Sequence, residues 1–122
     1  MSGVLYLTKE SRMLIIKDST IELNALHPAL ALALSGTVVP VLKEAGSNTI
    51  LTSGSEQSAR HGVTSLHYSG CAVDIRIRDP YKGVDLFDAK EAVDLLNKHL
   101  SIDFDVILES DHIHMEYQPK RR

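Results

Sequence analysis

Two segments of the sequence alternate between apolar and polar residues, and they limit the fold more than any other feature of the chain. Residues 72–78 read Ala-Val-Asp-Ile-Arg-Ile-Arg, and residues 112–117 read His-Ile-His-Met-Glu-Tyr. Successive side chains of a β-strand point to opposite faces, so this period of two predicts two strands that each have one buried and one polar face. The side chains expected in the core are Val73, Ile75, Ile77, Ile113, Met115 and Tyr117.

Two helices are expected beside these strands. From Pro28 onward, apolar residues recur every three or four positions, which predicts a core helix. Gly36 and Pro40 lie inside it, and an interior proline removes a backbone hydrogen bond, so either a kink or two shorter helices would fit. A later helix is predicted to begin at Asp88, which is followed by Glu91 in the spacing of a capping box.

The remaining strands complete a small sheet. They are predicted at 4–8 and 13–17 as an N-terminal hairpin, at 49–53, and at 104–108 as a C-terminal hairpin with 112–117. Strands and helices in mixed order, with a clear antiparallel pair, are typical of an α+β domain. We therefore expect one α+β domain over residues 1–122, with a mainly antiparallel sheet and helices packed on one of its faces.

Composition excludes several classes of function. The 122 residues are 43% hydrophobic and 24% charged, as in globular domains, and the formal net charge of −3 gives no basic surface for nucleic acid. Nucleic acid is therefore not an expected partner. No apolar stretch is long enough to cross a membrane, so a membrane is not an expected partner either. The single cysteine excludes an internal disulfide. The first residues lack the pattern of a secretory signal, so we expect a cytoplasmic protein.

The polar faces of the two alternating segments carry groups that bind metals. His112, His114 and Glu116 share one face of the second segment, Asp74 lies on the first, and His67 precedes Asp74 by seven residues. If the two strands are neighbours, these groups converge. Two imidazoles and a carboxylate are the ligands of many catalytic zinc sites, in which the metal activates a water molecule.

The region around these residues resembles a known family. Residues 65–74 fit the pattern S-x-H-x-x-G-x-A-x-D, and together with His112-Ile113-His114 they resemble the zinc D-Ala-D-Ala carboxypeptidases and L-alanyl-D-glutamate endopeptidases. The same stretches, with Glu109, also resemble the amino-terminal signalling domain of hedgehog proteins, which shares the peptidase fold. The resemblance covers about half of the chain, 51–117, and leaves the N-terminal hairpin outside.

The resemblance implies a set of site residues. Zinc would be held by His67, Asp74 and His114, and a carboxylate three residues before the last histidine, here Asp111, would be the general base. The family more often has glutamate at that position, and aspartate is one methylene shorter, so Glu109 is the alternative base. His112 would donate a hydrogen bond to the ligands or to the transition state.

Three residues of the expected loop at 53–65 are candidates for substrate binding. Arg60 offers a guanidinium fork to a substrate carboxylate, His61 would lie on the pocket rim beside the bound water, and Ser65 would donate a hydrogen bond to the peptide. Each has an ordinary alternative, since Arg60 and His61 could be solvated and Ser65 could cap the turn before His67.

The expected function follows from the resemblance. It is zinc-dependent hydrolysis of an amide bond in a peptidoglycan stem peptide, by a D,D-carboxypeptidase or an L-Ala-D-Glu endopeptidase. A chain of this size without a signal would be of the kind that a phage encodes and that reaches the cell wall by other means. The alternative is a non-catalytic, zinc-stabilised module of hedgehog-like fold that binds a peptide or a protein partner.

Overall fold

The computed structural model describes residues 14–56 and 70–119 of the chain. Within these ranges, the chain forms in succession β1 (Leu14–Ile16), α1 (Pro28–Ala33), the π-helical turn η2 (Leu34–Val38), α2 (Val39–Glu44), β2 (Thr49–Ser53), β3 (Ala72–Arg76), α3 (Ala89–His99), β4 (Phe104–Leu108) and β5 (His112–Tyr117). The bounds of β2, β4 and β5 are those expected from the sequence.

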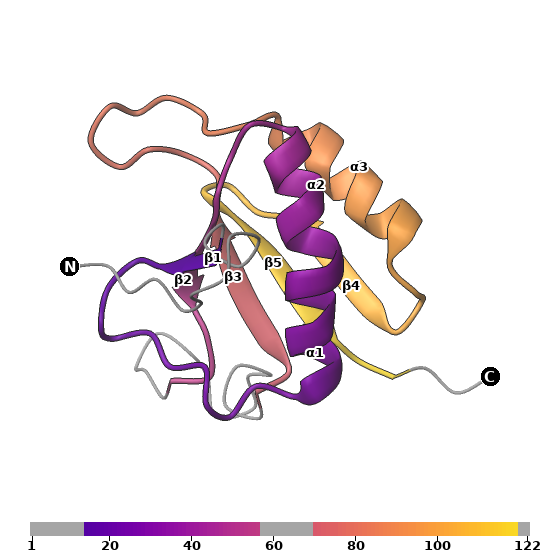
Figure 1. Cartoon of the computed structure of the whole chain (residues 1–122). Coiled ribbons are helices and arrows are strands. Elements are labelled where there is room, and N and C mark those ends of the chain that lie inside the picture. Colours follow the sequence, from indigo (N-terminus) through magenta and orange to yellow (C-terminus); the bar gives the residue numbers. More distant parts are fainter. Residues whose placement is uncertain (1–13, 57–69, 120–122) are drawn as a thin grey trace.

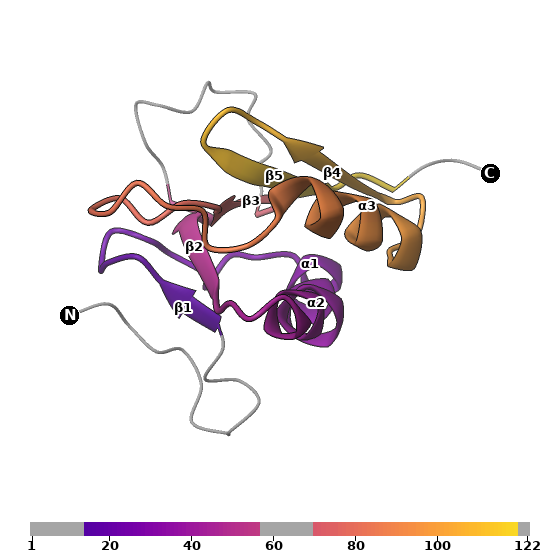
Figure 2. The ribbon, with the colours of Figure 1, turned by 90° about the horizontal axis from the view of Figure 1, so that it is seen from above.

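The described strands form one five-stranded sheet in the order β1-β2-β3-β5-β4 (Figures 1 and 2). β1 runs parallel to β2, and the other three neighbouring pairs are antiparallel. The prediction of an α+β domain with a mainly antiparallel sheet is therefore confirmed. The strand expected at 13–17 is shorter, and its expected hairpin partner, 4–8, lies outside the described residues.

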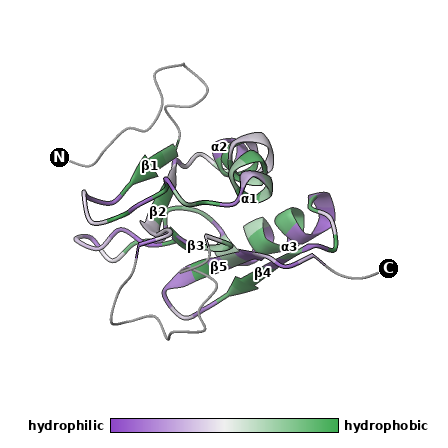
Figure 3. Cartoon of the chain, turned by 90° about the horizontal axis from the view of Figure 1, so that it is seen from below, coloured by the Kyte–Doolittle hydropathy of each residue, from purple (hydrophilic) through white to green (hydrophobic). Residues whose placement is uncertain are grey.

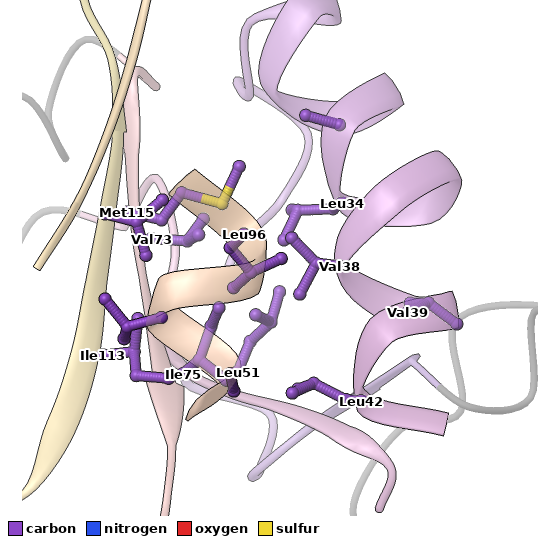
Figure 4. Packing of buried hydrophobic residues seen from close by; sticks show 14 of the residues in the cluster. Leu34, Val38, Val39, Leu42, Leu51, Val73, Ile75, Leu96, Ile113 and Met115 are labelled. Atoms are coloured by element: carbon purple, nitrogen blue, oxygen red, sulfur yellow. The ribbon is translucent and has the colours of Figure 1, made fainter. Parts of the chain in front are cut away.

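The helices pack on one face of the sheet, and the core lies between the two layers (Figure 1). Val73, Ile75, Ile113 and Met115 point from β3 and β5 into this layer and are fully buried. Figure 4 shows them opposite Leu34, Val38 and Leu42 of the first helical segment, with Leu96 of α3 among them. Figure 3 shows hydrophilic residues gathered in the turns, including the turn between β4 and β5. The inward face predicted for both alternating segments is confirmed.

The first helix continues through a π-helical turn without breaking. At η2, the backbone N–H of Val39 donates to the carbonyl of Leu34, five residues back. Pro40 follows at once and has no N–H for the carbonyl four residues before it, which belongs to Gly36. The wider turn accommodates the hydrogen bond that Pro40 cannot make. The segment is therefore one continuous helix with a π-turn and not two separate helices.

The strand expected at 72–78 ends two residues early. β3 stops at Arg76, after which Arg78 forms an isolated bridge with Asp85. Between them, the carboxylate of Asp79 accepts the backbone N–H groups of Tyr81 and Lys82, which closes the turn that the sequence indicated here. Asp88 caps α3 as predicted, because its carboxylate accepts the N–H of Glu91.

Candidate metal site and cleft

The register of β3 and β5 brings the polar residues of the two strands together. Asp74 is paired with His114, and Arg76 is paired with His112. Asp74 Oδ1 lies 2.9 Å from His114 Nδ1 and 3.5 Å from His112 Nε2. One ligand atom from each of these three residues lies within 4.8 Å of the others, so the group could hold a metal ion. The convergence expected from the sequence is thus found for Asp74, His112 and His114.

The spacing of these atoms suits a small transition metal. Two ligands bound at about 2.1 Å to a tetrahedral zinc ion stand about 3.4 Å apart, close to the spacings around Asp74. The side chains of Asp74, His112 and His114 are 15%, 29% and 20% exposed, so they are shielded from bulk water but reachable. Nitrogen and carboxylate oxygen are the donors that zinc accepts. The residues present therefore fit zinc.

A glycine fixes the start of β3 against the segment before α1. Gly70 has a φ of 76°, and a Cβ atom built on it would lie 1.8 Å from the carbonyl oxygen of Ala25. The Gly70 carbonyl accepts the N–H of His27, which joins the two segments. Both the left-handed conformation and the close approach require glycine, so the glycine of the S-x-H-x-x-G-x-A-x-D pattern positions the strand that carries Asp74.

His114 lies between two carboxylates. Its Nδ1 faces Asp74, and its Nε2 lies 2.9 Å from Oε1 of Glu116, two residues along β5. The hydrogen bond with Asp74 raises the pKa of His114 above its usual value, and the bond with Glu116 adds to this, against the effect of burial. The period of two in the sequence places Glu116 on this face but assigns it no role. In the structure, its carboxylate is within hydrogen-bond distance of the His114 ring, where it can orient the ring.

The two candidate bases lie differently. Asp111 Oδ1 is 2.6 Å from His112 Nδ1, and the carboxylate is 79% exposed at the mouth of the site. This hydrogen bond lowers the pKa of Asp111, so the group is ionised at neutral pH. Glu109 is exposed in the β4–β5 turn, where its backbone N–H donates to the carbonyl of His112. Of the two, only Asp111 lines the cleft beside Asp74.

A cleft of about 450 Å³ opens beside the metal-binding group. It extends from Asp74 and His112 along β3 to the turn that follows the strand. Its lining consists of Thr52, Asp74, Arg76, Arg78, Asp79, Pro80, Gly83, Asp111 and His112. The sequence does not indicate Thr52, whereas it places both arginines on the face of Asp74, where they would either line the cleft or be solvated.

Four of the candidate residues lie outside the described ranges. They are Arg60, His61, Ser65 and His67. The roles expected for them, substrate binding for the first three and metal binding for His67, remain predictions from the sequence.

Comparison of the chain with models of protein families, with curated proteins and with solved structures finds no match. Among the described residues, no helix has both the length and the apolar character needed to cross a membrane. A proposal of function therefore rests on the geometry of the site and on the sequence pattern around it.

Proposed function

We propose that this protein is a zinc-dependent hydrolase that cleaves an amide bond in the stem peptide of peptidoglycan. The observation that carries the proposal is the cross-strand pair of Asp74 and His114, with His112 in the same group and a cleft beside it. The S-x-H-x-x-G-x-A-x-D pattern that ends at Asp74 supports membership of the zinc carboxypeptidase and endopeptidase family. It also supports the fold that these peptidases share with the hedgehog signalling domain.

Asp74, His114 and His67 are the proposed zinc ligands. His67 comes from the sequence pattern, and the other two already lie together on the central strands. A bound zinc ion supplies a Lewis acid that polarises a carbonyl and lowers the pKa of a water molecule towards about 7. Glu116 accepts the second ring N–H of His114 and so keeps Nδ1 directed at the side of Asp74.

Asp111 is the proposed general base, and His112 is the proposed donor to the oxygen that becomes negatively charged. Asp111 is ionised and lines the cleft, so it can accept a proton from the attacking water and pass it to the leaving amine. His112 is hydrogen-bonded to Asp111 through Nδ1, which leaves its Nε2 facing the site at 3.5 Å from Asp74. In the protonated ring, which donates from both nitrogens, Nε2 can donate to the carbonyl oxygen on which negative charge develops.

The test is hydrolysis of a defined wall substrate. Zinc-loaded protein is incubated with purified peptidoglycan and soluble muropeptides, and the products are identified by mass spectrometry. We expect release of D-alanine or of a stem peptide cut between L-alanine and D-glutamate. The His114→Ala variant should release neither, whereas His99→Ala, which removes an exposed histidine at the end of α3, should match the wild type.

Two results would contradict the proposal. A purified protein that does not retain zinc would exclude the metal site. Equimolar zinc without product from any wall chemotype would exclude the peptidase and favour the alternative of a zinc-stabilised binding module.

A further inference from the structure

The cleft continues from the metal-binding group to a half-buried arginine. Arg76 follows Asp74 by two residues on β3 and therefore lies on the same face, with about 7 Å between the two Cα atoms. It is paired in register with His112. Both residues line the cleft, so the guanidinium of Arg76 is part of the same surface as the proposed reacting groups.

The two arginines of the cleft differ in their partners. Arg78 Nε donates to Asp85 Oδ1 at 3.1 Å, and this pair closes the turn after β3. Among the described residues, no hydrogen bond or ion pair engages the guanidinium of Arg76. Arg78 therefore stabilises the turn, whereas the N–H groups of Arg76 are available to bind a ligand.

The carboxylates in the lining make no hydrogen bond or ion pair with Arg76, although its charge acts over a longer distance on Asp79, and on Asp18 outside the lining. Asp79 accepts two backbone N–H groups, Asp111 is bonded to His112, and Asp74 is bonded to His114. A half-buried guanidinium with no direct hydrogen-bond partner among the described residues can bind an anionic ligand, and its planar fork matches a carboxylate.

We propose that Arg76 binds a carboxylate carried by the substrate residue on the leaving side of the scissile bond. This inference rests on the proposed function and specifies its substrate class. One residue of an extended peptide spans about 3.5 Å, so a carboxylate one or two residues beyond the reacting carbonyl matches the spacing of Asp74 and Arg76. Both candidate bonds meet this condition, through the terminal carboxylate of D-alanine or the α-carboxylate of D-glutamate.

The test compares two ligands that differ only in this charge. N-acetyl-D-alanyl-D-alanine and its C-terminal amide are titrated by calorimetry into zinc-loaded protein that carries Asp111→Asn, which slows turnover. In this background we expect the acid to bind about tenfold more tightly than the amide, as for a charge-assisted pair at a partly shielded site. Adding Arg76→Gln should bring the ratio to about one. Adding Arg76→Lys, which keeps the charge and loses the fork, should give an intermediate ratio.

Two control variants separate a specific contact from the general charge of the molecule. Lys90→Gln removes one positive charge from the exposed first turn of α3 and should leave the acid-to-amide ratio unchanged. Arg78→Gln removes one from the cleft and should change the ratio less than Arg76→Gln does. Circular dichroism and thermal unfolding confirm that each variant is folded, and Arg76→Lys serves as the test if Arg76→Gln is not.

The outcomes separate this inference from the proposed function. The role of Arg76 would be overturned if the Asp111→Asn protein bound the acid and the amide equally tightly. It would also be overturned if the ratio of the two affinities stayed the same after both substitutions of Arg76. If Arg78→Gln lowered the acid-to-amide ratio as much as Arg76→Gln does, the role of Arg76 would also be overturned. The preference for the acid would then come from the overall positive charge of the cleft and not from one contact. Discrimination through Arg76 in a protein whose wild type cleaves no wall peptide would support the anion site and overturn the peptidase.

Discussion

The two histidines on the polar face of β5, His112 and His114, each pair with an aspartate, and the two pairs are built in different ways. His114 and Asp74 meet across two central strands, with side chains 20% and 15% exposed. His112 and Asp111 are neighbours in sequence at the end of a strand, and the aspartate is 79% exposed. The first pair is held by the register of the sheet, which suits a fixed ligand set. The second has a carboxylate in solvent, which suits a group that takes up and releases protons.

The largest expected difference between the pairs is in metal affinity. His114→Ala should abolish measurable zinc binding, because it removes a proposed ligand. His112→Ala should lower the affinity by no more than the 10–100-fold that loss of an outer partner costs. Competition with a chelating dye measures both. Equal losses in the two variants would show that His112 is itself a ligand and would contradict the assignment of His67.

The next difference concerns the rate of hydrolysis. Asp111→Asn should retain zinc and lower kcat by about 100-fold or more, as expected for loss of a general base. The matched change Glu109→Gln, in the same turn but outside the lining of the cleft, should leave kcat near the wild-type value. Steady-state kinetics on a muropeptide, with zinc content measured in parallel, checks both. A fully active Asp111→Asn with an inactive Glu109→Gln would reverse the assignment.

Glu116 allows the first pair to be weakened without removing either member. Glu116→Gln should lower zinc affinity by about tenfold, because the neutral amide holds the His114 ring less firmly than the carboxylate at 2.9 Å does. The dye competition measures this change, with Glu109→Gln as the control. An unchanged affinity would show that the sheet alone orients His114.

The smallest effect is the pH dependence of the metal-free protein. The hydrogen bond with Asp74 raises the pKa of His114 above its ordinary value of 6.5, so the folded state holds this proton more tightly than the unfolded chain. The resulting stability is fully present below pH 6.5 and is lost as the pH rises through the raised pKa. Urea unfolding of the wild type and of His114→Gln should differ most at acid pH. A difference that does not change from pH 5 to pH 8 would contradict the raised pKa.

Much of the fold and part of the site could be predicted because strand periodicity is a local property. The bounds of β5, its buried face and the polar face that carries His112 and His114 all follow from the order of residues in one segment. The parallel pairing of β1 with β2 could not be predicted, because the partner of a strand depends on where the intervening helix packs. The sequence places Glu116 and Arg76 on the polar faces of their strands but does not give their roles, because these depend on which neighbours the side chains contact.

The helix and the loops show the same limit. Pro40 indicated a disturbance in the first helix, but whether the chain would break or widen its turn depended on the packing of Leu34, Val38 and Leu42 against the sheet. The metal ligand expected at His67 lies outside the described residues. For the described residues, the sequence alone supported Asp74 and His114 as members of one group, and the register of β3 and β5 supplied the distances.

The separation of 40 residues between Asp74 and His114 affects the order of events in folding. The β4–β5 hairpin has a short turn and can form within microseconds, whereas β3 must close a much longer loop before it reaches β5. The histidines are therefore expected to be in place before the aspartate arrives. A metal ion that needs both would bind late and would slow unfolding by holding β3 on β5. Zinc would then stabilise the β3–β5 strand pair, which is the last of these contacts to form.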